Sequence, residues 1–165
     1  QQHPDDAMAA EMLGRTCEEV EGSDASCARL EGFARQHADN PEAAAWAARQ
    51  ILERPHSGAD LDEADRMLTR AIAADPRNGD AWYETGLVDA ERSQWQQSAQ
   101  ALEKATALRP EFGPGHLQLA KAYRHLGRPA DEERELALFQ ACTQKEKDEI
   151  DARVRAMTVF LERSQ

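Results

Sequence analysis

The chain contains 165 residues, of which 41% are hydrophobic and 31% carry a charged side chain. This length and balance are typical of one folded domain or a short repeat array, and they exclude a chain that stays disordered. The 31 aspartates and glutamates outnumber the 20 lysines and arginines, which gives a formal net charge of -11. This excess of negative charge excludes general binding to nucleic acid phosphates and disfavours docking to an anionic membrane. No run approaches the ~18 apolar residues that a membrane-spanning helix needs.

The first forty residues predict two helices, over 5–20 and 26–40, which form a degenerate pair. Cys17 and Cys27 lie on either side of the loop between them, at equal distances from Gly22. Residues equally far from the turn of an antiparallel hairpin lie opposite each other. We therefore expect a disulfide between Cys17 and Cys27.

The expected disulfide implies an oxidising compartment, periplasmic or extracellular. The chain begins at Gln1 without Met, so we expect a processed or truncated product whose signal peptide is absent. One alternative is a cytoplasmic protein in which Cys17 and Cys27 are buried thiols. A second is a zinc site that adds His37 to the same two cysteines. Cys142 is expected to be a small buried apolar side chain.

The rest of the chain predicts helices throughout. Alanine is abundant, β-branched residues are scarce, and apolar residues recur three and four positions apart. Helix-breaking prolines and glycines are regularly placed, at 41, 55–58, 76–79, 110–115 and 127–129. The intervals predict helices of about 12–15 residues joined by short turns.

A shift of the sequence by 34 residues brings like residues together, which identifies an internal repeat. Three pairs of identical residues carry it: Leu68 with Leu102, Ala71 with Ala105, and Pro76 with Pro110. The repeating unit is a helix, a turn and a second helix.

This unit resembles the tetratricopeptide repeat family, strongly over 59–140 and best over 79–112. The residues at signature spacings in the best unit are Trp82, Gly86, Ser98, Leu102, Ala105, Leu108 and Pro110. The following unit carries Leu119, Ala120, Tyr123, Gly127, Leu136 and Phe139, and the preceding unit carries Trp46, Ala64, Leu68, Ala71, Ala74 and Pro76. A small residue at Gly86 lets the two helices of a unit approach closely, and the bulky Trp82 is expected to fill the space that remains.

The resemblance implies an all-α solenoid of antiparallel helix pairs, with about four units and eight or nine helices. The degenerate pair covers 1–40, and the units cover 41–78, 79–112 and 113–142. A capping helix is expected over 143–165.

The expected capping helix begins with Thr143 and Glu146 at the spacing of a capping box. Phe139 stands where the repeat normally has a small residue, which we interpret as the point where regular stacking stops. One apolar stripe follows, made of Ile150, Val154, Met157, Phe160 and Leu161. The alternative is a helix that binds a partner or a second copy.

The sequence contains no recognised catalytic motif: no nucleophile elbow, Walker loop, dinucleotide-binding glycines or zinc-protease helix. The histidines are scattered, at His3, His37, His56, His116 and His125. We therefore expect no catalytic residues, no cofactor and no metal site.

By the resemblance, the first helices of the units line the inner face of a right-handed superhelix. The residues expected to line a peptide-binding groove there are Tyr83, Leu87, Glu91, Leu117, Lys121, Arg124 and His125. An apolar floor beside basic side chains suits a peptide with apolar anchors and an acidic group. The alternative is that Tyr83, Leu87 and Leu117 pack against neighbouring units. Some family members grip a C-terminal carboxylate with Lys and Asn, but Tyr83 and Leu87 occupy two of those positions.

The expected function is a non-catalytic scaffold or assembly factor that holds a protein segment in this groove. The partner is a protein or peptide, with no nucleic acid and no insertion into a membrane. One alternative is a self-associating array that uses 143–165. Another is the repeat segment of a larger enzyme or biogenesis protein.

Overall fold

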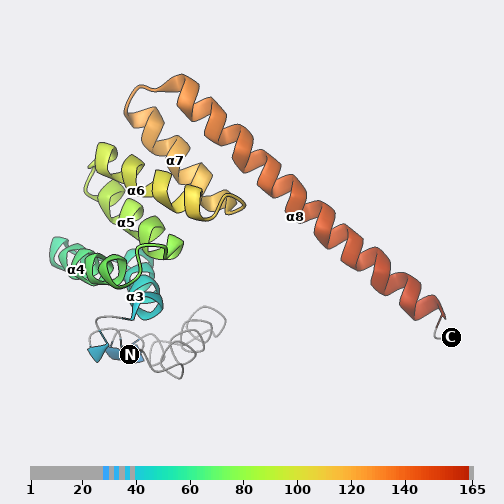
Figure 1. The fold of residues 1–165 in the computed structure, drawn as a ribbon, viewed down its shortest axis with the longest axis horizontal. Helices are drawn as coiled ribbons and strands as arrows, with labels where there is room; N and C mark the ends of the chain where they lie inside the picture. The colour runs from blue at the N-terminus through green and yellow to red at the C-terminus, as the bar shows by residue number, and fades with distance from the viewer. Residues whose placement is uncertain (1–27, 30–31, 34–35, 38–39, 164–165) are drawn as a thin grey trace.

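The computed structural model describes residues 28–29, 32–33, 36–37 and 40–163, with side chains as far as Thr158. Every regular element that is assigned in this part of the chain is an α-helix (Figure 1). The helices are α3 (Pro41–Glu53), α4 (Gly58–Ala74), α5 (Gly79–Glu91), α6 (Trp95–Leu108), α7 (Gly113–His125) and α8 (Pro129–Arg163). The predicted all-α class is confirmed.

Polar side chains fix the N-termini of three helices at the predicted turns. The side chains of Asn40 and Asn78 each accept a hydrogen bond from the backbone N–H three residues on, at 2.8 and 2.7 Å. Ser57 forms a reciprocal capping box with Asp60 at the start of α4. Each cap satisfies backbone donors that have no partner within the helix, so α3, α4 and α5 start where the turn chemistry predicts.

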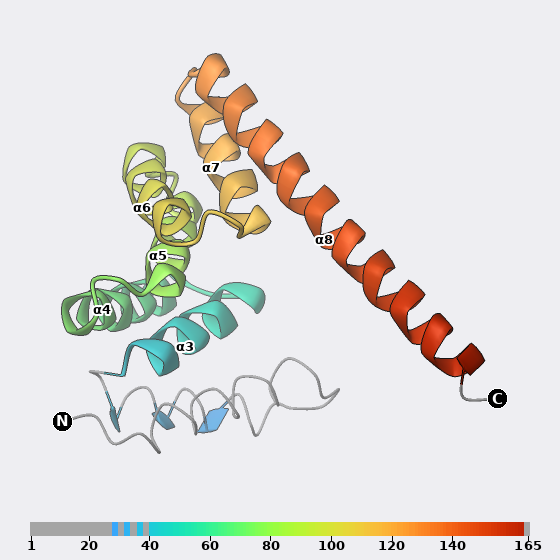
Figure 2. The ribbon, with the colours of Figure 1, turned by 45° about the vertical axis from the view of Figure 1, so that its right-hand side comes forward.

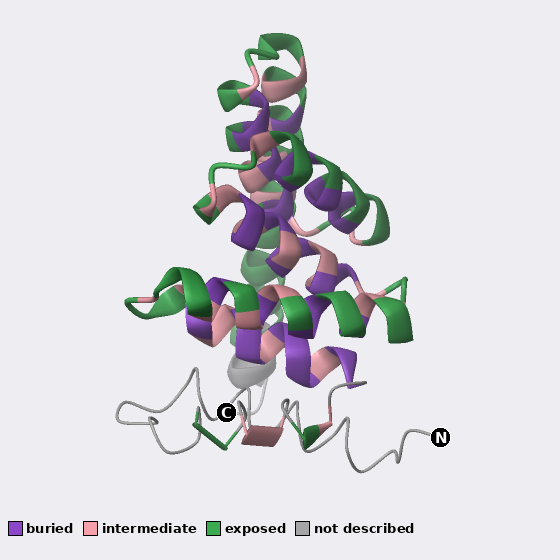
Figure 3. Cartoon of the chain, turned by 90° about the vertical axis from the view of Figure 1, so that its left-hand side faces the viewer, coloured by how far each residue is buried: buried purple, intermediate pink, exposed green. Residues whose placement is uncertain are grey.

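Consecutive helices pack in pairs, α3 with α4, α5 with α6 and α7 with α8, and the pairs stack along the chain. Figure 3 shows the buried sides of the helices turned toward each other. One core cluster joins α3, α4 and α5 and includes Ile51, Leu68 and Val88; Phe33 packs against it. A second cluster joins α5, α6 and α7 and includes Leu102, Leu119 and Tyr123.

Gly86 is the point of closest approach between α5 and α6. A Cβ atom there would lie 2.5 Å from Cγ of Leu102, inside contact distance. The Ser98 hydroxyl donates a hydrogen bond of 2.7 Å to the carbonyl of Gly86. These three signature residues act together, because only a residue without a side chain lets Leu102 and Ser98 reach the backbone of α5.

Two successive repeat units share a contact between an aromatic ring nitrogen and the backbone carbonyl of a proline. Trp82 donates through Nε1 to the carbonyl of Pro76 at 3.0 Å, and His116 Nε2 lies 3.0 Å from the carbonyl of Pro110. His116 is buried, and its Nδ1 lies 2.8 Å from the Glu135 carboxylate. Each ring nitrogen of His116 thus lies against an oxygen, one of a backbone carbonyl and one of a carboxylate.

Trp82 fills the space between the helices only in part. Its side chain is partly buried and packs against the second core cluster, and the ammonium of Lys104 lies 3.8 Å from the ring centroid. The indole therefore covers the edge of the core beside the turn at Pro76. Truncation of a fully buried tryptophan to alanine costs about 3–5 kcal/mol of stability. We expect a smaller loss for Trp82, because its side chain is only partly buried.

The expected helix boundary at 142/143 is also wrong, because α8 runs without a break through it. Thr143 lies inside the helix and donates its hydroxyl to the carbonyl of Phe139 at 3.0 Å. The residues from 144 to 158 are all exposed, so they do not cap the array. Figures 1 and 2 both show this part of α8 running away from the other described helices.

The described part contains six helices, fewer than the eight or nine predicted. The unbroken α8 accounts for one of the missing helices. The helix pair predicted over 1–40 falls mostly outside the described residues. Cys17 and Cys27 fall outside them too, so the disulfide and its zinc alternative stay predictions.

We predict that Gly86→Leu lowers the free energy of unfolding by about 1–3 kcal/mol, because the new side chain overlaps Leu102. Urea unfolding followed by circular dichroism measures the change. Gly58→Leu is the matched control, since a Cβ at Gly58 meets nothing within 4 Å. A Gly86→Leu protein as stable as the Gly58→Leu protein would contradict the close approach.

Candidate functional site

The inner face of the array carries three hollows that share lining residues, which we call together the inner groove. The first, of about 300 Å³, lies between α3 and the turns that precede α5 and α7, beside Trp46 and Phe112. The second, of about 400 Å³, lies between α3, α5 and α7. The third, of about 380 Å³, lies between α5, α6 and α7. Arg49 lines the first two hollows, and the last two share five residues: Leu87, Ala90, Glu91, Gln118 and Lys121.

The second hollow is built over an ion pair between α3 and α5. Arg49 donates through Nε to the carboxylate of Glu84 at 2.9 Å. The Glu84 side chain is 0% exposed, and its second oxygen has no hydrogen-bond partner. The guanidinium of Arg49 also lies 4.8 Å from the centroid of the Trp46 ring. Arg49 thus connects the first two hollows and holds α3 against α5.

Burial controls the protonation of Glu84. Removal from water raises the pKa of its carboxyl from the ordinary 4.5 to about 7, against the attraction of the Arg49 guanidinium. Ionisation of the buried Glu84 carboxyl costs free energy because one of its oxygens has no hydrogen-bond donor. The link between α3 and α5 is therefore sensitive to pH near neutrality.

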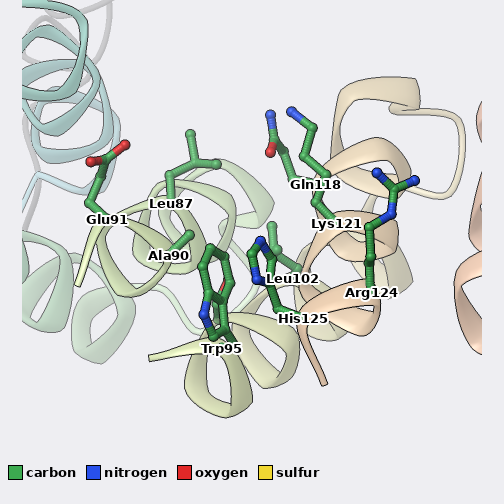
Figure 4. A pocket seen from close by; sticks show the side chains of 10 residues that line it. Leu87, Ala90, Glu91, Trp95, Leu102, Gln118, Lys121, Arg124 and His125 are labelled. Carbon is green, nitrogen blue, oxygen red and sulfur yellow. The ribbon is translucent and has the colours of Figure 1, made fainter. Parts of the chain in front are cut away.

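The third hollow has an apolar floor and a basic wall (Figure 4). Leu87 and Ala90 reach it from α5, and Trp95 reaches it from the start of α6. The rings of Trp95 and His125 stack with their centroids 3.6 Å apart and their planes 2° apart. This stack forms a flat shelf at one end of the hollow.

The charged side chains of the third hollow lie on opposite sides. Figure 4 shows Glu91 on the α5 side and Lys121 and Arg124 on the α7 side. Arg124 forms an ion pair of 2.6 Å with Glu132 of α8. The described residues offer exposed Lys121 neither a hydrogen bond nor an ion pair. Lys121 is thus a cation beside apolar surface with no internal partner described.

The structure brings most of the predicted groove residues together. Leu87, Glu91 and Lys121 line the second and third hollows, and Arg124 and His125 line the third. Their role in binding stays a prediction.

Two of the predicted groove residues differ from the expectation: Tyr83 is mostly buried, and Leu117 lies outside the inner groove. Tyr83 lines the second hollow but is 8% exposed and packs edge-on against Phe112, with ring centroids 5.0 Å apart. Burial raises the pKa of the Tyr83 phenol. Half-buried Leu117 lines none of the three hollows. For Tyr83, packing against neighbours is therefore the main role in the structure.

The sequence analysis did not predict several residues of the inner groove, among them Arg49, Glu84, Trp95 and Gln118. The repeat itself contained the signal for Arg49, which lies 34 residues before Tyr83 and so occupies the equivalent position one unit earlier. Trp95 was missed because only first helices were considered, and it starts a second helix.

The described residues include no group of three histidine, cysteine, aspartate or glutamate side chains that could hold a metal ion. Across the described helices, no segment combines the length and apolar character needed to cross a bilayer. The chemistry of the inner groove suits contact with a polypeptide segment, because the groove offers apolar surface, an aromatic shelf and charges of both signs.

Neither a family model nor a curated protein sequence matches the chain. Solved structures do match it. The crystal structure of MamA has a TM-score of 0.66 at 20% identity, over 88% of this chain and 82% of MamA. The second tetratricopeptide repeat domain of Spaghetti (RPAP3), bound to the HSP90 peptide SRMEEVD, has a TM-score of 0.57 at 14% identity. It covers 66% of this chain and 97% of that domain.

The chain has the tetratricopeptide repeat fold. At these identities the likeness establishes the fold alone. In the repeat array, α3, α5 and α7 are the first helices of successive pairs, and they line the inner groove.

We predict that Glu84 lowers the stability of the repeat array as pH rises from about 4.5 to about 7. The raised pKa means that the folded state keeps the proton which the unfolded state has already lost, so unfolding becomes easier across this range. The Glu84→Gln variant removes this contribution. Urea unfolding of both proteins at several pH values measures the difference between them, which should change over this range and level off above it. Parallel stability curves from pH 4.5 to 7 would contradict the buried state of Glu84.

Proposed function

We propose that the repeat array is a non-catalytic interaction scaffold that holds an extended protein segment in the inner groove. The observation that carries the proposal is Lys121, a cation with no described internal partner beside the apolar surface of Leu87 and Ala90. A side chain ammonium in such a place is complementary to an acidic group next to an apolar anchor. The aromatic shelf of Trp95 and His125 adds a flat surface for that anchor.

The dimensions of the groove support an extended segment. The inner helices α3, α5 and α7 have 13 residues each, which corresponds to a length of about 20 Å. An extended chain advances about 3.3 Å per residue, so about six residues would lie along the groove. Three hollows along that length offer a separate place for each large side chain.

The peptide complex of the RPAP3 domain supports this use of the fold, since a similar structure holds a peptide. The contacts in this chain would differ. Tyr83 and Leu87 stand at positions where a carboxylate clamp has polar side chains, and Tyr83 is mostly buried. We therefore propose recognition of an internal acidic and apolar segment instead of a free C-terminus.

We predict that selection from a randomised twelve-residue peptide display library enriches peptides with an acidic residue close to a large apolar one. Lys121→Glu should abolish that enrichment by replacing attraction with repulsion, while circular dichroism stays unchanged because Lys121 is exposed.

The matched control for Lys121→Glu is Arg70→Glu, which makes the same charge change at an exposed residue of α4 that lines none of the three hollows. It should select the same peptides as the unmodified protein. No enrichment by the unmodified protein, or equal enrichment by the Lys121→Glu protein, would overturn the proposal.

We also propose that the scaffold works in an oxidising compartment, a periplasm or the extracellular space. This proposal rests on the spacing of Cys17 and Cys27 about a turn in the sequence.

Mass analysis of intact, alkylated protein purified from an oxidising compartment should find one internal disulfide between Cys17 and Cys27, with Cys142 alkylated. Cys142 lies far along the chain on α8, which makes it the internal control for alkylation. Alkylation of all three cysteines without prior reduction would count against the oxidising compartment.

A further inference from the structure

The last part of α8 has no partner among the described helices. Among the described residues, the last ion pair that joins α8 to the rest of the array is between Lys145 and Glu111. From 144 to 158 every residue is exposed, and Figure 2 shows the helix continuing away from α3, α5 and α7. We call residues 144–158 the distal segment of α8.

The distal segment carries a concentrated strip of exposed apolar side chains. Ile150, Val154 and Met157 are 51%, 54% and 65% exposed. Their spacings of four and three residues place them on one side of the helix. The described residues include five large exposed apolar side chains in all, and three of them lie here. Such a concentration marks a surface that becomes covered.

The two halves of the distal segment carry opposite net charge, and this distribution favours a second copy as the partner. From 145 to 151 there are four acidic residues and two lysines, whereas from 152 to 158 there are two arginines and no acidic residue. Two copies side by side in the same direction would bring the acidic halves together. Two copies in opposite directions place each acidic half beside a basic half.

We infer that the distal segment of α8 pairs with the same segment of a second copy, in antiparallel orientation. The apolar strips form the seam, with Ile150 of one copy beside Val154 of the other. Two repeat arrays are thereby joined through their last helices, and both inner grooves stay open.

Sedimentation equilibrium of the full chain under reducing conditions tests this pairing. The unmodified protein should form a dimer, and Ile150→Gln with Val154→Gln should raise the dimer dissociation constant at least about tenfold, because apolar burial is lost in both copies. The matched control is Ala152→Gln with Ala156→Gln, two exposed alanines on the other side of the helix. The control should change the dissociation constant less than about threefold.

Removal of charge tests the orientation. Asp148→Asn with Glu149→Gln should weaken an antiparallel dimer, because the basic half of the other copy then loses its opposite charge. In a parallel pair the same double variant would strengthen association by relieving repulsion between the acidic halves. A protein that stays monomeric at all concentrations, a dimer insensitive to Ile150→Gln with Val154→Gln, or a dimer strengthened by Asp148→Asn with Glu149→Gln would overturn the inference.

Discussion

The close approach of paired helices at small residues is the constraint on which the array depends. At Gly86, the missing side chain lets Leu102 lie against the backbone of α5 and lets Ser98 bond to its carbonyl at 2.7 Å. This contact sets how α6 lies on α5 and so which side of α5 remains for α3 and α7. The inner groove is the consequence, because it is lined by the sides of first helices that second helices leave uncovered.

Local chemistry explains why so much of the fold was predictable. Caps such as Asn40 and Asn78 lie at turns that the sequence marks clearly, and the 34-residue repeat identifies the pairing of helices. The error at Thr143 came from the same kind of evidence. Its spacing to Glu146 matches a capping box, but the helix already runs through this point from Pro129, so no helix starts there. A short motif cannot reveal whether backbone donors are already satisfied.

The site was less predictable because exposure depends on neighbours that the sequence does not place. Trp82 and Tyr83 are adjacent, yet the bulky signature residue is partly exposed and the expected groove residue is mostly buried. The charge pattern was more reliable, since Lys121 is exposed and its position on α7 follows from the repeat. Glu84 had no signal in the sequence, because its burial comes from α3 packing across it through Arg49.

Nuclear magnetic resonance of the backbone amides measures most directly whether the inner groove is the binding surface. Titration with a short peptide that alternates leucine and aspartate should shift the amides of Ala90, Gln118 and Lys121, which line the groove from α5 and α7. The resonances of amides on the outer side of α4 should not shift. Shifts confined to α4, or no shifts at millimolar peptide, would contradict the account.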